Sequence, residues 1–472
     1  MKNIGRFYIG GGWVDASARP ARPLFNPATD MPYGEVAMGT ADDVNLAVAA
    51  ARNAFPTFSI TTIAERLSLL QRILAVYRRR YEDFVAAITE EMGAPVTLSR
   101  NAQAAAGIDH LEATIAALKD FDVVQRIGNA EIHREPMGVC ALITPWNWPI
   151  NQIVCKVAPA LAAGCTMVLK PSELTPQSAE LFAEVLHEAG VPPGVFNMVH
   201  GDGPGVGAAL SSHPDVDMVS FTGSTAAGVS VAINAAPGIK RVAQELGGKS
   251  ANILLDDTDF ENAVPQALLA CMENSGQSCN APTRLLVPAS RHDEVLSLAA
   301  SAARAIRVGD PQDEATDMGP VVSKVHYEKV RGFIETGRAQ GAVLAAGGSA
   351  RVTGTNGYFI SPTVFGNVTS DMVIAQEEIF GPVLALMPYR DEEDAVAIAN
   401  GTRYGLSAYV TSRDTDRALK LARRLRAGMV HINGAMIGAE VPFGGYRQSG
   451  NGREGGRFGI EEFTEIKAVL LP

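Results

Sequence analysis

The sequence predicts an α/β protein with two sheets of mainly parallel strands. Short apolar runs alternate with helical patterns between Gly138 and Leu255, and a second alternating series follows between about Phe260 and Asn433. The chain has 472 residues, of which 47% are hydrophobic and 19% charged, so it is long enough for two domains with large buried cores. Strands that alternate with helices form a parallel sheet covered on both faces, and ligands bind beyond the carboxyl ends of its strands.

Two helices are predicted before the first series. Thr40 and Asp43 have the spacing of a capping box for the first of them. The second is predicted from Ile63 to Tyr81, because apolar residues recur there at spacings of three and four. It ends with the arginines 78–80, which favour the carboxyl end of a helix, so this run indicates a solvated helix end rather than a phosphate site.

The first series contains five predicted strands, at residues 139–144, 166–170, 195–200, 218–222 and 251–255. The helix after the second of these has Thr175 as its cap, Pro176 in its first turn and Gly190 at its end. The second series contains four predicted strands, at residues 283–287, 383–389, 406–411 and 429–433. The polar segment 309–320 is predicted to be a surface loop.

Two stretches belong to neither series: residues 120–136 and the last dozen residues of the chain. Both have the pattern of strands. Strands of this kind often pair with another subunit, although an edge strand within one subunit is the alternative.

Composition and charge narrow the class of partner. The formal net charge of -11 and the isoelectric point near 5.3 argue against binding to nucleic acid or an anionic membrane, and favour a small-molecule partner. No apolar run has the length of a secretory signal or a membrane span, so the cytoplasm is the expected location. The five cysteines include no C-x-x-C pair, which supports neither a disulfide framework nor a metal site.

One cysteine has a setting unlike the others. Cys279 ends the run Asn274-Ser-Gly-Gln-Ser-Cys279, where a small, flexible backbone allows close approach of a substrate and can direct amides at a thiolate. Glu245 begins a second glycine-marked run, Glu245-Leu-Gly-Gly-Lys249. If the thiol and the carboxylate meet in space, they supply a nucleophile and a base. A buried structural cysteine is the alternative for Cys279 taken alone.

Two glycine-rich loops follow strands of the first series. Gly223-Ser-Thr-Ala-Ala-Gly228 opens a helix directly after a strand, a geometry that exposes backbone N–H groups to a phosphate. Gly201-Asp-Gly-Pro-Gly-Val-Gly207 is denser in glycine. Neither has the spacing of a dinucleotide-binding or nucleoside-triphosphate fingerprint, so a structural turn is the alternative for each.

Two polar motifs follow the first two strands of this series. In Pro145-Trp-Asn-Trp-Pro149, rigid residues surround Asn147, whose amide can donate to a developing oxyanion or simply cap its own turn. In Lys170-Pro-Ser-Glu173, the carboxylate can accept both hydroxyls of a ribose. A solvated ion pair in a loop is the alternative for that motif.

Taken together, these motifs resemble those of the aldehyde dehydrogenase superfamily over nearly the whole chain. Seven of them occur in the order typical of that family: Pro-Trp-Asn-Trp-Pro, Lys-Pro-Ser-Glu, Phe-Thr-Gly-Ser-Thr, Glu-Leu-Gly-Gly-Lys, Gly-Gln-Ser-Cys, Glu-Glu-Ile-Phe-Gly-Pro and Pro-Phe-Gly-Gly. The resemblance implies a Rossmann-like NAD-binding domain at residues 1–119 and 137–247 and a catalytic domain at 248–449. It also implies oligomerisation strands at 120–136 and 460–472, a return to the cofactor domain at 450–459, and a homodimer or homotetramer.

The resemblance implies the roles of the catalytic residues. Cys279 attacks the aldehyde to give a thiohemiacetal, Asn147 and the Cys279 backbone N–H hold its oxyanion, and Glu245 activates water to hydrolyse the later thioester. Lys156 and Glu454 resemble a pair that relays protons from the base; a buried structural ion pair is the alternative. The expected substrate pocket lacks an arginine for a carboxylate, which favours a neutral or aromatic aldehyde; it comprises Gln152, Cys155, Ser278, Asn280 and Met436.

The resemblance also implies an NAD site and no catalytic metal. Lys170 and Glu173 resemble ligands of the adenosine ribose, Ser224 the pyrophosphate site, Glu378 a ligand of the nicotinamide ribose and Phe380 a wall of that pocket. Because Glu173 would repel a 2′-phosphate, NAD is expected in preference to NADP. Further cofactor contacts are expected from Ile143, Thr144, Trp146, Ser172, Gly203, Gly207, Phe221, Thr222, Gly223 and Leu246.

Three other functions compete with this one. In an acylating dehydrogenase, coenzyme A takes the acyl group, but such enzymes typically lack the glutamate that Glu245 matches. A cofactor-independent cysteine esterase needs a base, usually histidine, and none of the eight histidines has a setting like that of Cys279. A non-catalytic binding protein on the same fold is the third possibility.

Overall fold

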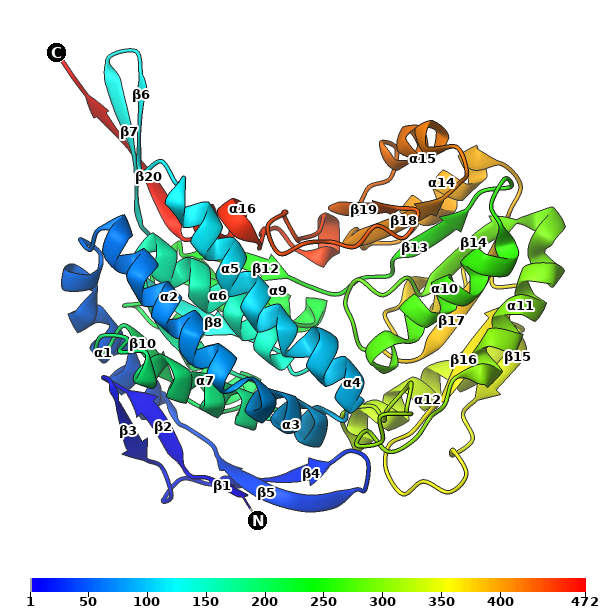
Figure 1. Ribbon diagram of the computed structural model, residues 1–472, viewed down its shortest axis with the longest axis horizontal. Helices are drawn as coiled ribbons and strands as arrows, with labels where there is room; N and C mark the ends of the chain where they lie inside the picture. Colours follow the sequence, from blue (N-terminus) through cyan, green and yellow to red (C-terminus); the bar gives the residue numbers. More distant parts are fainter. Residues whose placement is uncertain (1) are drawn as a thin grey trace.

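The computed structural model describes residues 2–472 and confirms the predicted α/β class, with two large sheets side by side (Figure 1). The first sheet has seven strands, which are parallel except at the β10–β2 and β2–β3 pairs. Their order is β12 (Arg241–Glu245), β11 (Met218–Thr222), β8 (Val139–Ile143), β9 (Thr166–Lys170), β10 (Phe196–Met198), β2 (Arg6–Ile9) and β3 (Gly12–Asp15).

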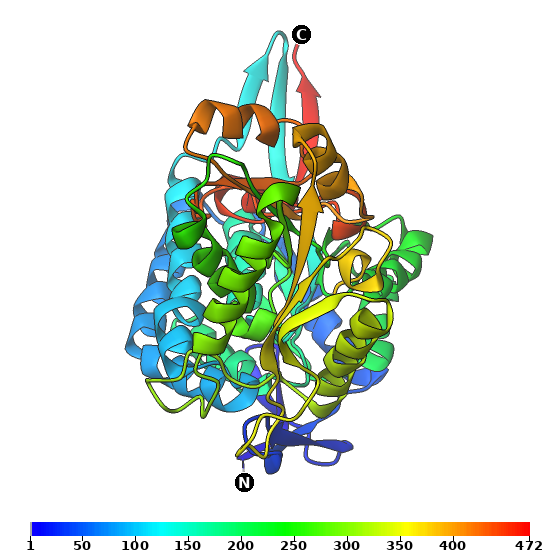
Figure 2. The same cartoon turned by 90° about the vertical axis from the view of Figure 1, so that its right-hand side faces the viewer.

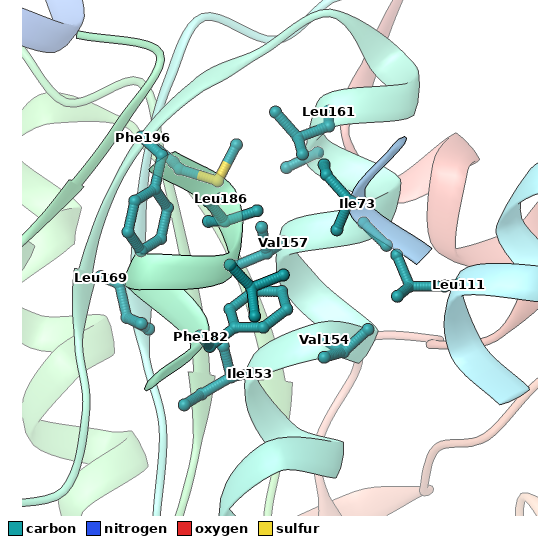
Figure 3. Close-up of a cluster of buried hydrophobic side chains, with 14 of the residues drawn as sticks. Ile73, Leu111, Ile153, Val154, Val157, Leu161, Leu169, Phe182, Leu186 and Phe196 are labelled. Atoms are coloured by element: carbon teal, nitrogen blue, oxygen red, sulfur yellow. The ribbon is translucent and has the colours of Figure 1, made fainter. Parts of the chain in front are cut away.

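The first sheet is buried on both faces because its strands are apolar at successive positions. On β8, Cys140 and Leu142 lie in one hydrophobic cluster, and the alternate residues Val139, Ala141 and Ile143 lie in another. Figure 3 shows part of the first cluster, where Leu169 and Phe196 of the sheet pack near helical side chains. The helices of that cluster are α2 (Ile63–Arg79), α3 (Tyr81–Met92), α5 (Ala105–Lys119), α6 (Pro149–Ala163) and α7 (Pro176–Glu188).

The opposite face of the first sheet is covered by α1 (Ala41–Phe58) and α9 (Thr225–Ala235). The predicted capping box is present at α1, where Asp43 accepts from the backbone N–H of Thr40 at 2.8 Å. The predicted helix from Ile63 ends two residues early, at Arg79, because the chain leaves helical geometry at Arg80 and Tyr81 begins α3. Short helices complete this half: α4 (Val96–Leu98), α8 (Ala208–Ser212) and α16 (Gly456–Glu462).

The second sheet also has seven strands, all parallel except the β15–β16 pair. Its order is β15 (Val343–Gly348), β16 (Ser361–Gly366), β17 (Val383–Tyr389), β14 (Arg284–Pro288), β13 (Ala251–Leu254), β18 (Ser407–Thr411) and β19 (Met429–Ile432). One face packs on α10 (Phe260–Met272) and α11 (His292–Ala305). The other packs on α12 (Lys324–Ala339), α13 (Val373–Gln376), α14 (Glu392–Asn400) and α15 (Thr415–Ala422).

One strand assignment from the sequence was wrong. Residues 251–255 were predicted to close the first series, but β13 lies inside the second sheet, between β14 and β18. The last parallel strand of the first sheet is β12 instead, which pairs with β11 from Arg241 to Glu245. Only two of its five residues, Val242 and Ala243, are apolar, so no apolar run marked it as a strand.

Two three-stranded sheets lie outside the main layers (Figures 1 and 2). The first has the order β1 (Lys2–Ile4), β5 (Met31–Ala37) and β4 (Ala21–Asn26). The second has the order β20 (Thr464–Leu470), β7 (Ala130–Pro136) and β6 (Val124–Ile127), and it projects from the body as an arm. The two stretches that fitted neither series therefore pair with each other. No helix within residues 2–472 has the length and apolar character needed to cross a membrane.

Candidate active site

The predicted site residues lie where an edge of one large sheet meets an edge of the other. In the first sheet, Ile143 of β8, Lys170 of β9 and Phe221 of β11 are in register, so the loops after these strands leave the same edge. Glu245 ends β12 beside Thr222 at that edge. In the second sheet, by contrast, the site segments precede strands: Glu245–Lys249 leads into β13, Cys279 into β14 and Glu378 into β17. The carboxyl edge of one sheet thus meets the amino edge of the other.

The loop before Cys279 has an unusual backbone. After α10 the chain forms a single turn, Glu273–Gly276, in which Asn274 and Ser275 have φ angles of 54° and 57°. These left-handed conformations are costly for residues other than glycine and persist only where the surroundings enforce them. The hydroxyl of Ser275 donates to the carbonyl of Gly319 at 2.8 Å, which anchors the turn from one side.

Buried amides hold the same loop against the Pro145–Pro149 segment. The side chain of Asn147 donates to the carbonyl of Gln277 at 3.0 Å, and Asn274 donates to the carbonyl of Asn147 at 2.9 Å. Gln103 donates to the Asn274 side chain at 2.8 Å, and Trp148 donates from its indole to the Ser278 hydroxyl at 2.8 Å. Because the Asn147 amide has two N–H groups, one remains for a ligand near Cys279.

The double glycine after Glu245 brings a second segment onto the nucleophile loop. A Cβ atom at Gly248 would overlap the carbonyl oxygen of Cys279, so only glycine allows this approach. A Cβ atom at Gly247 would overlap the carboxylate of Glu378. The Gly248 backbone N–H donates to Glu378 at 2.9 Å. The motif that carries the predicted base therefore also positions the predicted nucleophile and one predicted cofactor ligand.

Cys279 is the one partly exposed cysteine in residues 2–472; the other four are buried. Burial raises the pKa of its thiol well above the usual range, and the carboxylates of Glu378, Glu245 and Glu454 raise it further. The protein alone therefore keeps the thiol protonated at neutral pH. The thiolate needs either a base or a positive charge brought by a ligand.

Glu245 lies in an acidic, buried cluster. Its side chain is 4% exposed, and neither carboxylate oxygen has a hydrogen-bond partner within residues 2–472. Burial raises its pKa well above the usual range, the charge of Glu454 raises it further, and Lys156 opposes both effects. Lys156 donates to Glu454 at 2.5 Å and to the Ser220 hydroxyl at 3.1 Å. A carboxyl group with these properties can act as a base near neutral pH.

An open cavity leads to Cys279 and contains about 1020 Å³ of empty space, its mouth included. Four of the five residues predicted to form the substrate pocket line it: Gln152, Ser278, Asn280 and Met436. The fifth, Cys155, lies behind the cavity wall with Glu245 and Lys156, where its thiol donates to Glu454 at 3.3 Å. Glu454 lines both spaces.

The loop after β9 contains the predicted ribose ligands. Lys170 donates to the carbonyl of Gly201 at 2.9 Å and lies 3.4 Å from Glu173. Burial lowers the pKa of Lys170, and the carboxylate of Glu173 partly offsets this effect. On its other side Glu173 lies 3.3 Å from Arg22 of β4. Ser172 accepts a hydrogen bond from the N–H of Leu174 and thereby shapes the loop.

The loop after β11 forms a helix N-terminus. Ser224 caps α9 and accepts from the N–H of Ala227 at 3.3 Å, which leaves the first N–H groups of the helix free for an anion. A Cβ atom at Gly223 would overlap the ring of Phe221. The hydroxyls of Thr144 and Thr222, at the ends of β8 and β11, are buried and have no partner within residues 2–472. These unpaired polar groups beside a helix N-terminus fit a dinucleotide. Ile143, Phe221 and Leu246 pack in the cluster beneath them, and Gly203 and Gly207 bound one helical turn nearby.

Aromatic rings surround the predicted nicotinamide pocket. Phe380 adopts a φ angle of 62°, and its ring lies edge-on to Trp146 with centroids 5.5 Å apart. His326 is hydrogen-bonded to the carbonyl of Phe380 at 2.6 Å, and burial lowers its pKa to about 4, so the imidazole is neutral and donates. Burial also raises the pKa of Glu378 to about 6.

Sequence reasoning missed Gln103, Gln277 and His326. Gln277 lay within a quoted motif but received no role, although its fully buried side chain accepts from the N–H of Val322 at 2.9 Å. Gln103 and His326 had no local signal, because each acts on a residue at least 50 positions away. Within the described chain, no group of three His, Cys, Asp or Glu side chains could hold a metal ion.

Comparisons with known proteins agree with this geometry. The model of the aldehyde dehydrogenase family matches residues 13–469. A 3-succinoylsemialdehyde-pyridine dehydrogenase from a Pseudomonas species is 54% identical over 472 residues, which cover 100% of this chain and 99% of the relative.

Solved structures that resemble this chain are also aldehyde dehydrogenases. A mutant of aldehyde dehydrogenase C from Pseudomonas syringae, complexed with NAD⁺ and octanal, is 50% identical with a TM-score of 0.98, and the match covers 99% of this chain and 96% of that one. An aldehyde dehydrogenase from Mycobacterium tuberculosis, complexed with NAD⁺, is 41% identical with a TM-score of 0.97, and the match covers 100% and 99% of the two chains. The protein therefore belongs to the aldehyde dehydrogenase family.

Proposed function

We propose that this protein oxidises an aldehyde to a carboxylic acid, with NAD⁺ as hydride acceptor and water as the acceptor of the acyl group. The observation that carries the proposal is that three segments are in contact. The Asn147 amide is hydrogen-bonded to the loop before Cys279, and the Glu245–Gly248 motif packs against that loop. The NAD⁺ complexes of two structural relatives support the cofactor. The test is NADH formation across a panel of aldehydes, and absence of turnover with every aldehyde would refute the proposal.

In the first half-reaction, the Cys279 thiol releases its proton to water, its sulfur forms a bond to the aldehyde carbon, and the carbonyl oxygen becomes an oxyanion. The free N–H of the Asn147 amide and the Cys279 backbone N–H donate to that oxyanion, which lowers the barrier by several kcal/mol, roughly 2.7–4 per donor. Bound NAD⁺ would supply a positive charge near the thiol and accept the hydride. Loss of the hydride from the former aldehyde carbon leaves a thioester on Cys279.

In the second half-reaction, water attacks the thioester carbon and Glu245 takes its proton. The carbon–sulfur bond then breaks, which releases the carboxylic acid and regenerates the Cys279 sulfur. The buried, unpaired carboxylate of Glu245 suits this step because its raised pKa makes it a stronger base than an ordinary glutamate. Lys156 and Glu454 can then pass the proton away from Glu245, since their ion pair lies beside it.

The pH dependence of thioester hydrolysis tests this relay. Glu245 must be ionised to act, so the hydrolysis rate falls as the pH drops through its raised pKa. Glu454→Gln removes a charge that raises this pKa and should move the acidic limb to lower pH, whereas Lys156→Met should move it to higher pH. Single-turnover kinetics measure both shifts. Breaking the buried pair also lowers the free energy of unfolding by about 3–5 kcal/mol. A relay also requires the hydrolysis rate above the acidic limb to fall in both variants, whereas a purely structural pair would shift the limb and leave that rate unchanged.

The choice between NAD and NADP is proposed to depend on Glu173. Its carboxylate would repel a 2′-phosphate, while Arg22, 3.3 Å away, is a cation that could bind one. Glu173→Ser should therefore raise kcat/KM for NADP by about tenfold or more, because one repulsive pair at short range is worth more than ~1 kcal/mol. Arg22→Ala in the same background should reverse the gain. Unchanged NADP kinetics in Glu173→Ser would contradict this role.

For the substrate, we propose a neutral or aromatic aldehyde. The cavity that reaches Cys279 has no Lys or Arg among its lining residues, so it offers no partner for a carboxylate. The octanal bound by one structural relative and the pyridine in the name of the Pseudomonas relative are in keeping with this class.

We also propose that the chain forms a homodimer or homotetramer through the β20–β7–β6 arm. The arm exposes Ile127, Ile466 and Leu470, and such apolar strands outside a core favour pairing with another subunit. The domain boundaries given by the resemblance are proposed to hold, since each large sheet falls within one of them. Light scattering should give twice or four times the mass of one chain. A monomer at micromolar concentration would contradict the proposal.

A further inference from the structure

The cavity that leads to Cys279 has an uneven distribution of charge. Asp109 of α5 and Glu273, at the start of the nucleophile loop, both line it, and so does Glu454. Glu454 is compensated by Lys156. Neither Asp109 nor Glu273 forms an ion pair or a side-chain hydrogen bond within residues 2–472. The cavity therefore carries two uncompensated carboxylates and no cationic side chain.

The remaining polar groups of the wall do not offset this charge. His110 is hydrogen-bonded to Asn151 at 2.7 Å, and burial lowers the pKa of its imidazole, so it is neutral at physiological pH. The side-chain oxygen of Gln152 is buried and has no donor in the described chain. The side chain of Glu273 is exposed, partial desolvation raises its pKa, and no neighbouring cation lowers it. The wall thus adds no positive charge, and Gln152 contributes an acceptor without a donor.

We infer that this cavity selects aldehydes by the charge of their tails, and that Asp109 and Glu273 are the residues that set the selection. The inference rests on the proposed function, because it describes access to Cys279. An anionic tail enters a space with two unpaired carboxylates and is disfavoured. A neutral tail meets the apolar wall formed by Trp148, Met436, Val441 and Phe443, and a tail with a protonated nitrogen supplies the missing positive charge.

A size-matched pair of substrates tests the selection. Succinic semialdehyde and its methyl ester differ chiefly in one negative charge, so we expect kcat/KM to favour the ester by about twentyfold or more. Asp109→Asn and Glu273→Gln should each reduce that ratio about fivefold, and the double variant should reduce it further. In a second pair, an aldehyde with a quaternary ammonium tail should have a higher kcat/KM than its neutral tert-butyl isostere. Glu261→Gln, an equal charge change in the first turn of α10, should leave both ratios unchanged.

A second measurement does not depend on turnover. Iodoacetamide and iodoacetate each form a bond from the Cys279 sulfur to a methylene carbon and release iodide, but only iodoacetate is anionic. The measured quantity is the rate of Cys279 alkylation by iodoacetamide divided by the rate with iodoacetate, obtained by peptide mass spectrometry. We expect this ratio to exceed the ratio at a small free thiol by about tenfold. It should fall in the Asp109→Asn/Glu273→Gln variant. Thermal melting shows that the variant is folded.

The outcomes distinguish a failure of the charge selection from a failure of the proposed dehydrogenase function. Equal alkylation ratios in the wild type and the double variant would overturn the inference, even if neutral aldehydes are oxidised. The expected ratios together with no oxidation of any aldehyde would leave the charge selection standing and refute the proposed dehydrogenase function.

Discussion

Replacing Cys279 with alanine is expected to abolish NADH formation, with a fall in kcat of roughly four orders of magnitude or more. No other cysteine of residues 2–472 can take its place, because the remaining four are buried. The loss should be chemical rather than structural, since the loop is held by contacts of Asn274, Ser275 and Gln277 that do not use the thiol. Steady-state NADH absorbance measures the loss, and binding of NAD⁺ by calorimetry should persist.

A matched control distinguishes the nucleophile from a cysteine that only packs. Cys271 lies in the last turn of α10 in a fully buried position, eight residues before Cys279. Cys271→Ala should keep turnover within a few-fold of the wild type and lose about 1 kcal/mol or more of stability, because a buried group is removed. Comparable activity in both variants would mean that Cys279 is not the nucleophile.

Glu245→Gln is expected to separate the two half-reactions. The amide keeps the shape of the side chain but cannot take a proton from water, so the thioester forms and persists. The first turnover should give a burst of one NADH per active site, after which the steady-state rate falls by about 100-fold or more. Intact-protein mass spectrometry should find the acyl group, and peptide mapping should place it on Cys279.

Glu91 supplies the control for a buried glutamate without a catalytic role. Its carboxylate accepts from the N–H of Gln177 and caps α7, and burial raises its pKa to about 7. Glu91→Gln should reduce stability and leave the burst and the steady-state rate in their wild-type proportion. A Glu245→Gln enzyme that turns over without accumulating an acyl group would remove Glu245 from the deacylation step.

Strands and helices with strong apolar patterns could be predicted closely from the sequence. Residues 166–170, 218–222 and 383–389 were predicted with the bounds that the structure gives. The apolar pattern could not predict which sheet a strand joins, because a largely apolar run such as β13 fits a buried position in either sheet. The edge strand β12 was also missed, because three of its five residues are charged or polar and only its last residue is buried.

In the site, too, features that are local in the sequence could be predicted and contacts between distant residues could not. Motifs that are continuous in sequence, such as those of Asn147 and Cys279, could be recognised and now lie in contact. Contacts between remote positions could not be recognised without the fold: Lys156 and Glu454 are 298 residues apart, and Gln103 and Asn274 are 171 apart. The acidic charge of the cavity belongs to the second group, because Asp109 and Glu273 become neighbours of one space only after folding.

The fate of the thioester tests the central claim most directly. The wild-type enzyme is incubated with an aldehyde, NAD⁺, coenzyme A and water enriched in heavy oxygen, and the acyl products are identified by mass spectrometry. We expect a carboxylic acid that carries one heavy oxygen from water, because Glu245 directs water to the acyl group on Cys279. Acyl-coenzyme A as the sole product would contradict it.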